Sequence, residues 1–341
     1  MRRVVVNRPG GHRALEFLEE REPAVGTGQV RVRVRAAGVN YADCVVRMGH
    51  YEAAKGRYPI TPGFEFAGEV DGVSAGAGFK NGERVVGITR FGGYSSSLAV
   101  DAAQLWRVPE GWSFEQAAAF PAVHLTAWYA LHRVARVHAG ETVLVHSAAG
   151  GVGTALVQLA AAAGCPSVAV VGSPEKAALP RELGAAAVVV RDRKGAFWKE
   201  VDEAAPHGFD AVFDANGVTT LRPGYDRLAP GGMLVVYGFA DMLPRGRDRA
   251  GWLGLAMRYA RVPRFNPFEL TKLNRAVAGF NVVYLFNKPE LAGHAMGEML
   301  ALVRQGKLRP PKVTAFPAER VADAHRALES GSTTGKLVLT F

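Results

Sequence analysis

Cysteine is scarce in this chain, and so are acidic side chains and long apolar runs. Only two of the 341 residues are cysteines, Cys44 and Cys165, which excludes a disulfide framework and a zinc site made of four thiolates. The segment Met1–Pro9 lacks the apolar core of a secretion signal, so we expect a cytoplasmic protein. Hydrophobic residues make up 48% of the chain, which excludes general disorder, and the length suits two domains.

The stretch from Thr142 to Pro174 contains no Asp, Glu, Lys or Arg. A membrane-spanning helix needs about 20 mostly apolar residues in unbroken helical phase. The glycines of the segment Gly150–Gly153 and Pro166 interrupt this stretch. It therefore predicts a buried strand, a glycine turn, a buried helix and a second buried strand, and we expect no stable membrane insertion.

Basic side chains outnumber acidic ones by 41 to 31, which gives a formal net charge of +10. Nucleic acid, an anionic membrane surface and phosphorylated small molecules are all partners that fit such a charge, and a general arginine bias fits it equally. The segment 241–275 alone has eight basic and three acidic residues. Its basic residues are Arg245, Arg247, Arg249, Arg258, Arg261, Arg264, Lys272 and Arg275. This concentration favours a phosphorylated small molecule and makes nucleic acid an unlikely partner, although a solvated helical lid explains it too.

The predicted strands change character along the chain. Before residue 110, short segments such as Val30–Ala37 and Ala67–Val73 alternate with glycine and proline turns, which predicts an antiparallel, barrel-like domain. From Thr142 to Tyr237, apolar strands alternate with helices, which indicates a parallel sheet covered on both faces. The fold class is therefore α/β, with a doubly wound sheet and a second domain of mainly antiparallel strands.

Other elements are predicted from local signals. Ser113 and Gln116 form a capping box at the start of a helix. We expect a helix over Pro174–Leu183 and a strand near Gly279–Leu285. The last strand, Lys336–Phe341, is expected to rejoin the first domain.

A glycine turn joins the strand Thr142–His146 to the alanine-rich helix predicted over Thr154–Ala163. Gly150 and Gly151 permit a tight turn and close approach of a pyrophosphate, and Gly153 permits close packing of helix on strand. This context favours dinucleotide binding over a simple tight turn. The predicted contacts of the turn are Ala149, Gly150, Gly151, Val152 and Gly153.

The next predicted strand ends at Gly172 and Ser173, where an NAD-selective site has a carboxylate. Lys176 and Arg191 are placed to pair with an adenosine 2′-phosphate, although both also suit a solvated surface. Glu175 disagrees with this interpretation unless it points outward. We therefore predict NADPH as the cofactor, with Ser173 among its contacts.

Four stretches carry a resemblance to a known family. They are Ala36–Asp43, Pro62–Val70, Ala148–Gly153 and Thr334–Leu339. On these the chain resembles the zinc-independent quinone oxidoreductase branch of the medium-chain dehydrogenases/reductases, and Asn274–Phe280 is most similar to VAT-1-like proteins. The resemblance implies a GroES-like catalytic domain, residues 1–122 and 287–341, around a Rossmann domain, residues 123–286. It also implies a homodimer formed through the edge of the Rossmann sheet.

The resemblance also implies how the site differs from that of zinc alcohol dehydrogenases. Asn40, Phe64 and Ala122 stand where those enzymes have zinc ligands, so we predict no metal. Without a Lewis acid, hydride transfer is easiest to a conjugated carbon–carbon double bond. Asn40 is then the candidate donor to the substrate oxygen, and Tyr51 or Tyr41 is the candidate proton donor.

Further cofactor contacts follow from the resemblance and from loop position. Thr126 resembles the family threonine near the nicotinamide. Asn216, Tyr237 and Gly238 lie at the carboxyl ends of predicted strands, where a dinucleotide binds. Lys336 is expected to approach the cofactor from the tail. Asp43 and Glu65 are expected to form structural hydrogen bonds, and His124 to be structural.

Three functions remain open at this point. The preferred one is NADPH-dependent reduction of an α,β-unsaturated carbonyl compound, most of all a short enoyl-CoA thioester. The second is quinone reduction. The third is a VAT-1-like NADPH-binding protein with a role at a membrane or on RNA.

Overall fold

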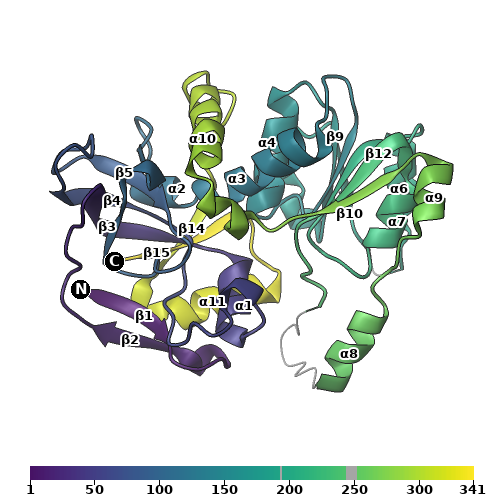
Figure 1. Cartoon of the computed structure of the whole chain (residues 1–341). Coiled ribbons are helices and arrows are strands. Elements are labelled where there is room, and N and C mark those ends of the chain that lie inside the picture. The colour runs from purple at the N-terminus through teal and green to yellow at the C-terminus, as the bar shows by residue number, and fades with distance from the viewer. Residues whose placement is uncertain (193, 243–251) are drawn as a thin grey trace. The chain divides into compact units, whose positions relative to one another are not determined.

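The computed structural model describes residues 1–192, 194–242 and 252–341 of the chain (Figure 1). These residues form two compact units, each with its own sheet. Unit 1 comprises Met1–Leu125 and Val282–Phe341, and unit 2 comprises Thr126–Asn281.

Unit 1 is built on a seven-stranded sheet in which all pairs but one are antiparallel. Its order is β14-β15-β3-β4-β5-β7, and β6 pairs with β3 off this path. The strands are β3 (Gln29–Val39), β4 (Glu65–Val73), β5 (Arg84–Ile88), β6 (Ser97–Asp101), β7 (Leu105–Arg107), β14 (Val313–Pro317) and β15 (Lys336–Thr340). A separate hairpin joins β1 (Arg2–Val6) to β2 (Leu15–Glu19).

The alternation of residues in β3 shows why this sheet forms. Val30, Val32 and Val34 are buried in the core, while the arginines between them point outward. Arg31, for example, donates to Asp71 at 2.8 Å. One face of the sheet is therefore apolar and the other is lined with ion pairs.

The helices of unit 1 lie between its strands in the order of the chain. They are α1 (Tyr41–Met48), α2 (Phe114–Ala118), α10 (Pro289–Arg304) and α11 (Val321–Ser330), and α3 (Pro121–Trp128) crosses into unit 2. The predicted capping box of α2 is confirmed, because Ser113 Oγ accepts from Gln116 N at 3.2 Å and Gln116 Oε1 accepts from Ser113 N at 3.0 Å. The predicted return of the tail is also confirmed, since Leu337 of β15 pairs with Val39 of β3.

Unit 2 is a doubly wound sheet of six parallel strands, as predicted, in the order β10-β9-β8-β11-β12-β13. Helices cover both of its faces, with α4 on one side and α6 and α7 on the other (Figure 1). The strands are β8 (Val143–His146), β9 (Ser167–Val171), β10 (Ala187–Val190), β11 (Phe209–Asp214), β12 (Leu228–Val236) and β13 (Ala276–Gly279). The helices are α4 (Gly151–Ala162), α5 (Ala178–Glu182), α6 (Phe197–Ala204), α7 (Leu221–Asp226), α8 (Trp252–Ala260) and α9 (Pro267–Leu273).

Two element predictions are wrong. The strand expected near Gly279–Leu285 is β13, which ends at Gly279 because its ladder with β12 ends at Val236. The following residues, Val282–Asn287, form a 3-10 helix. The helix expected over Pro174–Leu183 is divided into a 3-10 turn, Pro174–Lys176, and α5. Pro180 has no N–H for the carbonyl of Lys176, so a continuous helix would lose that hydrogen bond.

Candidate functional site

Asn40, Glu65 and Lys336 form a compact polar cluster in unit 1. The Lys336 ammonium lies 2.5 Å from Asn40 Oδ1 and 2.6 Å from Glu65 Oε1. Asn40 Nδ2 donates to the same Glu65 oxygen at 2.9 Å. The side chains of Lys336 and Glu65 are 4% and 0% exposed, so this ion pair is shielded from water. We call these three residues the Asn40 cluster.

The Asn40 cluster fixes which way the asparagine amide points. An ammonium only donates and a carboxylate only accepts, so Oδ1 must face Lys336 and Nδ2 must face Glu65. One of the two N–H groups on Nδ2 is used by Glu65, and no described residue accepts the other. Asn40 is half-buried, so this second N–H can serve a ligand. The site therefore offers a hydrogen-bond donor whose orientation is fixed by a buried ion pair.

Local backbone features make room for Glu65. A Cβ added at Gly38 would lie 2.6 Å from the Ala118 carbonyl oxygen and would also meet the Glu65 carboxylate. Glu65 Oε2 accepts from the backbone N–H of Ala122 at 2.7 Å. The sequence suggested only a structural hydrogen bond for Glu65. The position of an acidic residue in an apolar strand indicated that Glu65 needs a buried partner. No nearby sequence pattern identified Lys336 as that partner.

The two candidate tyrosines have different surroundings. Tyr41 is the first residue of α1, next to Asn40, and is half-buried. The ring of Tyr51 makes edge contacts with Phe64 and Phe91, at centroid distances of 5.7 and 6.5 Å. Tyr41 thus adjoins the Asn40 cluster in the chain, whereas the Tyr51 ring is part of an aromatic cluster.

His124 has a structural environment. Its ring stacks on Phe120 at 3.9 Å, and its Nδ1 hydrogen-bonds the Phe120 carbonyl at 2.8 Å. Burial lowers the pKa of His124 to about 3, so the ring is neutral. Close by in the chain, Thr126 is buried in α3.

In unit 2, the glycine turn lies between β8 and α4. Gly150 is the residue before the first turn of α4, which begins at Gly151 rather than at Thr154 as predicted. A Cβ added at Gly153 would lie 2.6 Å from Ala148 Cα, so only glycine permits this close approach of helix to turn. The N–H groups of Gly151, Val152 and Gly153 are at the start of α4, a position that suits an anion.

Polar groups meet where the strand order of unit 2 reverses, between β8 and β11. Ser147 Oγ donates to Asn216 Oδ1 at 2.7 Å, which links the ends of these two strands. The buried Asp214 carboxylate accepts from the N–H groups of Asn216 and Gly217 at 2.7 and 2.9 Å. Tyr237 follows β12, and its N–H donates to the Asp214 carbonyl at 3.0 Å. Such a reversal is where nucleotides bind in open α/β sheets.

The residues predicted to hold a 2′-phosphate lie at neighbouring strand ends. Val190 of β10 pairs with Val171 of β9, and the N–H of Arg191 donates to the Val171 carbonyl at 2.8 Å. Ser173 precedes the 3-10 turn that contains Lys176. Ser173 and Arg191 therefore follow adjacent strands. A hydrogen bond from Ser173 lowers the pKa of Glu175, which keeps a negative charge at this edge.

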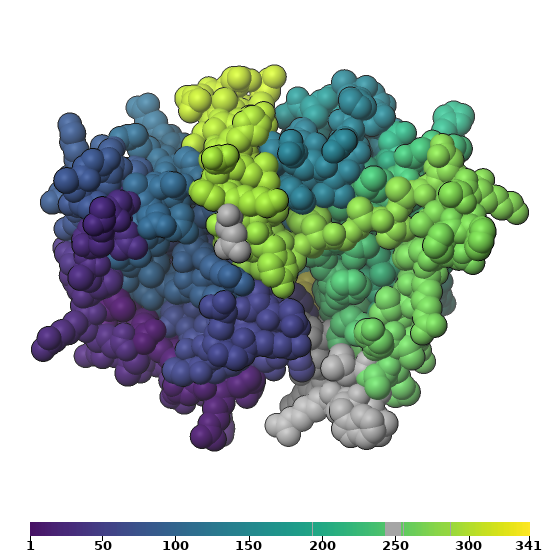
Figure 2. All heavy atoms as spheres, in the orientation of Figure 1, coloured from purple at the N-terminus to yellow at the C-terminus, as the bar shows by residue number. Residues whose placement is uncertain are grey.

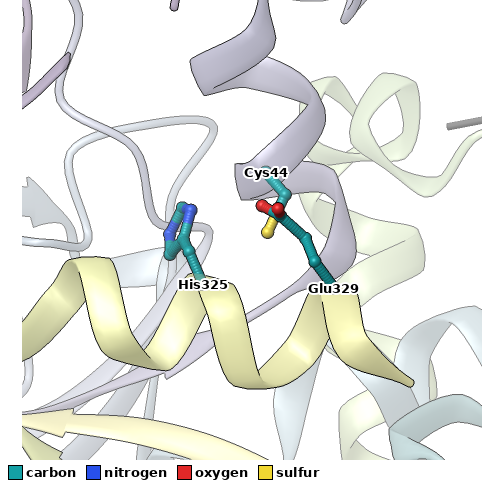
Figure 3. Close-up of side chains that lie close together, drawn as sticks. All are labelled: Cys44, His325 and Glu329. Carbon is teal, nitrogen blue, oxygen red and sulfur yellow. The ribbon is translucent and has the colours of Figure 1, made fainter. Parts of the chain in front are cut away.

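A second group of polar side chains lies between α1 and α11 (Figure 3). The ligand-type atoms of Cys44, His325 and Glu329 are within 4.8 Å of one another. Arg47 Nη2, however, lies 2.8 Å from Glu329 Oε1, and its Nη1 lies 3.4 Å from His325 Nδ1. Burial raises the pKa of the Cys44 thiol and lowers that of His325, so both groups are neutral. We interpret this group as a buried Arg47–Glu329 ion pair, because the guanidinium already balances the carboxylate.

The basic segment 241–275 of unit 2 lies partly at the protein surface. Arg258 and Arg275 donate to the carbonyl oxygens of Asp241 and Tyr225 at 3.0 and 3.2 Å. Arg261, Arg264 and Lys272 are exposed. The segment 256–275 that contains them is green in Figure 2. The predicted contributions of Arg245, Arg247 and Arg249 lie outside the described residues.

Among the residues that the structure describes, no helix has the length and apolar character that crossing a bilayer requires.

Two family models match the chain. Residues 26–110 match the alcohol dehydrogenase GroES-like domain, and residues 183–339 match the zinc-binding dehydrogenase family. The residues at the positions where zinc alcohol dehydrogenases have their ligands do not fit a catalytic zinc ion. Asn40 and Glu65 already hold the Lys336 ammonium, Phe64 packs in an apolar cluster, and Ala122 offers only its backbone. Zinc sites use thiolate, imidazole and carboxylate ligands.

Known proteins resemble this chain along its whole length. It is 35% identical over 318 residues to the synaptic vesicle membrane protein VAT-1 homolog of Rattus norvegicus, covering 93% of this chain and 78% of that protein. The quinone oxidoreductase of Thermus thermophilus, also solved with NADPH, has 34% identity, full coverage of both chains and a TM-score of 0.80. The CurK enoyl reductase has 25% identity, coverage of 99% and 98%, and a TM-score of 0.83. The chain therefore belongs to the medium-chain dehydrogenase/reductase family, in its quinone oxidoreductase-like, VAT-1-like branch.

Proposed function

We propose that the protein is an NADPH-dependent oxidoreductase that reduces the activated double bond of an α,β-unsaturated carbonyl compound. The main observation behind this proposal is the Asn40 amide, which Lys336 and Glu65 hold in one orientation with a second N–H left for a ligand. A carbonyl oxygen is the acceptor that such a donor fits. Membership of a family with NADPH-bound quinone oxidoreductases supports the same activity.

Unit 2 has a cradle that fits NADPH. The N–H groups of Gly151, Val152 and Gly153 at the start of α4 are the proposed donors to the pyrophosphate. Ala149 and Gly150 are the other proposed contacts of the turn, although the N–H of Gly150 donates to the Ser147 carbonyl at 2.9 Å. Ser173, Lys176 and Arg191 are assigned to the 2′-phosphate. Thr126, Asn216, Tyr237, Gly238 and Lys336 complete the proposed contacts. NADPH supplies the hydride when it is bound.

The Asn40 cluster stabilises charge on the substrate. As the β-carbon of a conjugated carbonyl compound gains a hydride, negative charge grows on the carbonyl oxygen. Asn40 donates its second N–H to that oxygen, while the Lys336 ammonium holds Oδ1 and balances the charge of the Glu65 carboxylate. The α-carbon then takes up a proton, for which Tyr51 and Tyr41 are the proposed donors.

A short enoyl-CoA thioester is the proposed substrate, ahead of quinones. The exposed Arg261, Arg264 and Lys272 suit the phosphates of a coenzyme A tail. The similarity to the CurK enoyl reductase also supports an enoyl substrate.

The test is oxidation of NADPH by the purified protein with crotonyl-type CoA esters, simple enones and benzoquinones. We expect turnover of the CoA esters, and we expect Asn40→Ala to lower kcat by about 100-fold, since one donor to a developing oxyanion contributes on that order. Asn7→Ala is the matched control, because Asn7 makes one hydrogen bond to Glu16 in the hairpin β1–β2. Turnover of quinones alone would reject the thioester, and an Asn40→Ala variant as active as the control would reject the role of the amide.

A second candidate function is binding to an anionic surface. Met257 and Phe268 are 60% and 84% exposed in the segment that carries Arg261, Arg264 and Lys272. Exposed apolar and basic side chains together suit a membrane or RNA. Salt-dependent binding to anionic vesicles or single-stranded RNA supports this role, and negligible binding at low salt removes it.

We also propose a homodimer. β13 is at one end of the six-stranded sheet and, among the described residues, no further strand pairs with it. An open strand edge can pair with a second copy of the chain. Light scattering tests this proposal, and a monomeric mass at micromolar concentration contradicts it.

A further inference from the structure

A chain of buried hydrogen bonds in unit 1 leads from Arg47 to Asp43, three residues after Asn40. Arg47 Nη1 is 3.4 Å from His325 Nδ1, and His325 Nε2 is 3.2 Å from the Tyr94 hydroxyl. That hydroxyl donates to Asp43 Oδ2 at 3.0 Å. All four side chains are almost completely buried. The catalytic proposal above makes no use of them.

The direction of every bond in this chain is determined by its first member. Arg47 can only donate, so His325 Nδ1 accepts and the imidazole proton is on Nε2. Nε2–H then donates to the Tyr94 oxygen, and the Tyr94 proton is left for Asp43. The positive charge of Arg47 and the burial of the ring lower the pKa of His325, which keeps this neutral form. The chain therefore delivers a hydrogen-bond donor to Asp43.

Asp43 connects this chain to the Asn40 cluster. Its Oδ2 also accepts from the backbone N–H of Asn40 at 2.8 Å, and its Oδ1 accepts from that of Gly63 at 2.8 Å. Gly63 has a φ of +100° and precedes Phe64 and Glu65. The Asp43 carboxylate thus holds the backbone at Asn40 and just before Glu65. All three of its partners donate hydrogen bonds, so a proton on the Asp43 carboxylate would take the place of one of them on an oxygen.

Other titratable groups also face Asp43 or its partners. They are the Lys336 ammonium, the Cys44 thiol, the Glu65 carboxylate, the His325 ring and the Tyr94 hydroxyl. Burial raises the pKa of Asp43 to about 7, while its hydrogen bonds and the charge of Lys336 lower it. Burial also raises the pKa of Tyr94 well above its ordinary value, so the hydroxyl keeps its proton.

We propose that Tyr94, oriented by Arg47 and His325, is a positioning residue that keeps Asp43 ionised and thereby sets the pH range in which Asn40 binds the substrate oxygen. This inference rests on the proposed reductase function. The ionised Asp43 holds the Asn40 backbone in place. Once Asp43 is protonated, it releases one of its donors and the amide loses its fixed position.

The test is the pH profile of kcat/KM for Tyr94→Phe, which removes only the hydroxyl. Loss of one hydrogen bond to a carboxylate, about 1.4 kcal/mol, moves its titration by about one pH unit. We expect the acid limb of the profile to move upward by that amount, with kcat above the limb within about threefold of wild type and an unchanged KM for NADPH. Tyr58→Phe is the matched control, because its hydroxyl donates to the Val46 carbonyl and not to this chain. The acid limb of the control should not move.

Substitutions of His325 show whether the hydrogen-bond chain positions Asp43 or whether these side chains only pack in the core. In His325→Gln, the amide keeps one acceptor for Arg47 and one donor for Tyr94. We therefore expect the acid limb of its kcat/KM profile at the same pH as in wild type. His325→Leu interrupts the chain and should move the limb in the same direction as Tyr94→Phe. A uniform loss of kcat in these variants, with no movement of the limb, overturns the proposal.

Thermal unfolding between pH 5 and 9 gives a readout that needs no activity. A raised pKa of Asp43 in the folded state makes the free energy of unfolding fall as the pH rises towards that pKa. If Tyr94→Phe raises this pKa further, the fall continues to a higher pH than in wild type. The difference in stability between wild type and Tyr94→Phe should therefore grow between pH 7 and pH 8. A constant difference overturns the role of Tyr94 even if the protein reduces no substrate in the panel. A growing difference in a protein without reductase activity would instead reject the proposed function alone.

Discussion

Replacing Lys336 with methionine removes the positive charge from the Asn40 cluster while keeping a side chain of similar length. The ammonium lies 2.6 Å from a Glu65 carboxylate with no exposed surface. Removing one partner of such a buried pair costs about 3–5 kcal/mol, because the other charge is left without compensation. Glu65 keeps its hydrogen bonds from Asn40 and Ala122, which places the expected loss at the lower end of that range.

Hydrogen exchange followed by mass spectrometry measures this loss where it occurs. For peptides from β3, β4 and β15, the free energy of the opening that permits amide exchange should be about 3 kcal/mol lower in Lys336→Met than in wild type. Peptides from β8 and β9 of unit 2 provide an internal control. Lys55→Met is the matched variant, since the exposed Lys55–Glu52 pair contributes at most about 1 kcal/mol.

The double variant Lys336→Met/Glu65→Gln shows whether charge is the cause. It removes both charges and should recover most of the lost stability, since no buried charge remains in the Asn40 cluster. A loss in Lys336→Met no larger than in Lys55→Met, or a double variant less stable than the single one, refutes the reasoning.

Three other predictions concern the cofactor, acid stability and the thiols. Replacing Lys176 and Arg191 together with alanine should raise the KM for NADPH at least about 30-fold, because two charge-assisted bonds are lost. The KM for NADH should change little. Equal changes of the two KM values in steady-state kinetics contradict the assignment. Burial lowers the pKa of His124 to about 3, so between pH 6.5 and about pH 3 only the unfolded chain binds this proton. Stability should then fall by about 1.4 kcal/mol per pH unit as the pH decreases, and urea unfolding of His124→Gln should lack this contribution. Cys44 and Cys165 are buried with raised pKa values, so a thiol reagent should modify neither in the native protein and both in urea; rapid native labelling is the contrary result.

The sequence predicted those features of the fold that local patterns determine. The glycine turn, the apolar strands of unit 2 and the capping box at Ser113 each depend on residues close together in the chain. The errors arose where longer-range pairing decides the outcome. The end of β13 is set by the end of β12, and the break before α5 by the missing N–H of Pro180.

The same distinction applies to the site. Asn40 was a candidate from sequence, but the partners that orient its amide come from β4 and β15. Lys336 was expected to contact the cofactor, and its ion pair with Glu65 appears only in the folded unit. Tyr94 and His325 are joined to Asp43 across three separate parts of the chain, so no local pattern could identify them.

The position of Lys336 in β15 has a consequence for biosynthesis. Unit 1 is interrupted by the whole of unit 2, and β15 pairs with β3 only after unit 2 has been translated. A nascent chain that has not reached residue 336 contains Asn40 and Glu65 but lacks their counter-charge. Translation that stops early therefore produces a protein whose dinucleotide-binding half can be complete while its first domain is unstable. Incomplete products should thus be sensitive to proteolysis in unit 1, and only full-length synthesis completes the Asn40 cluster.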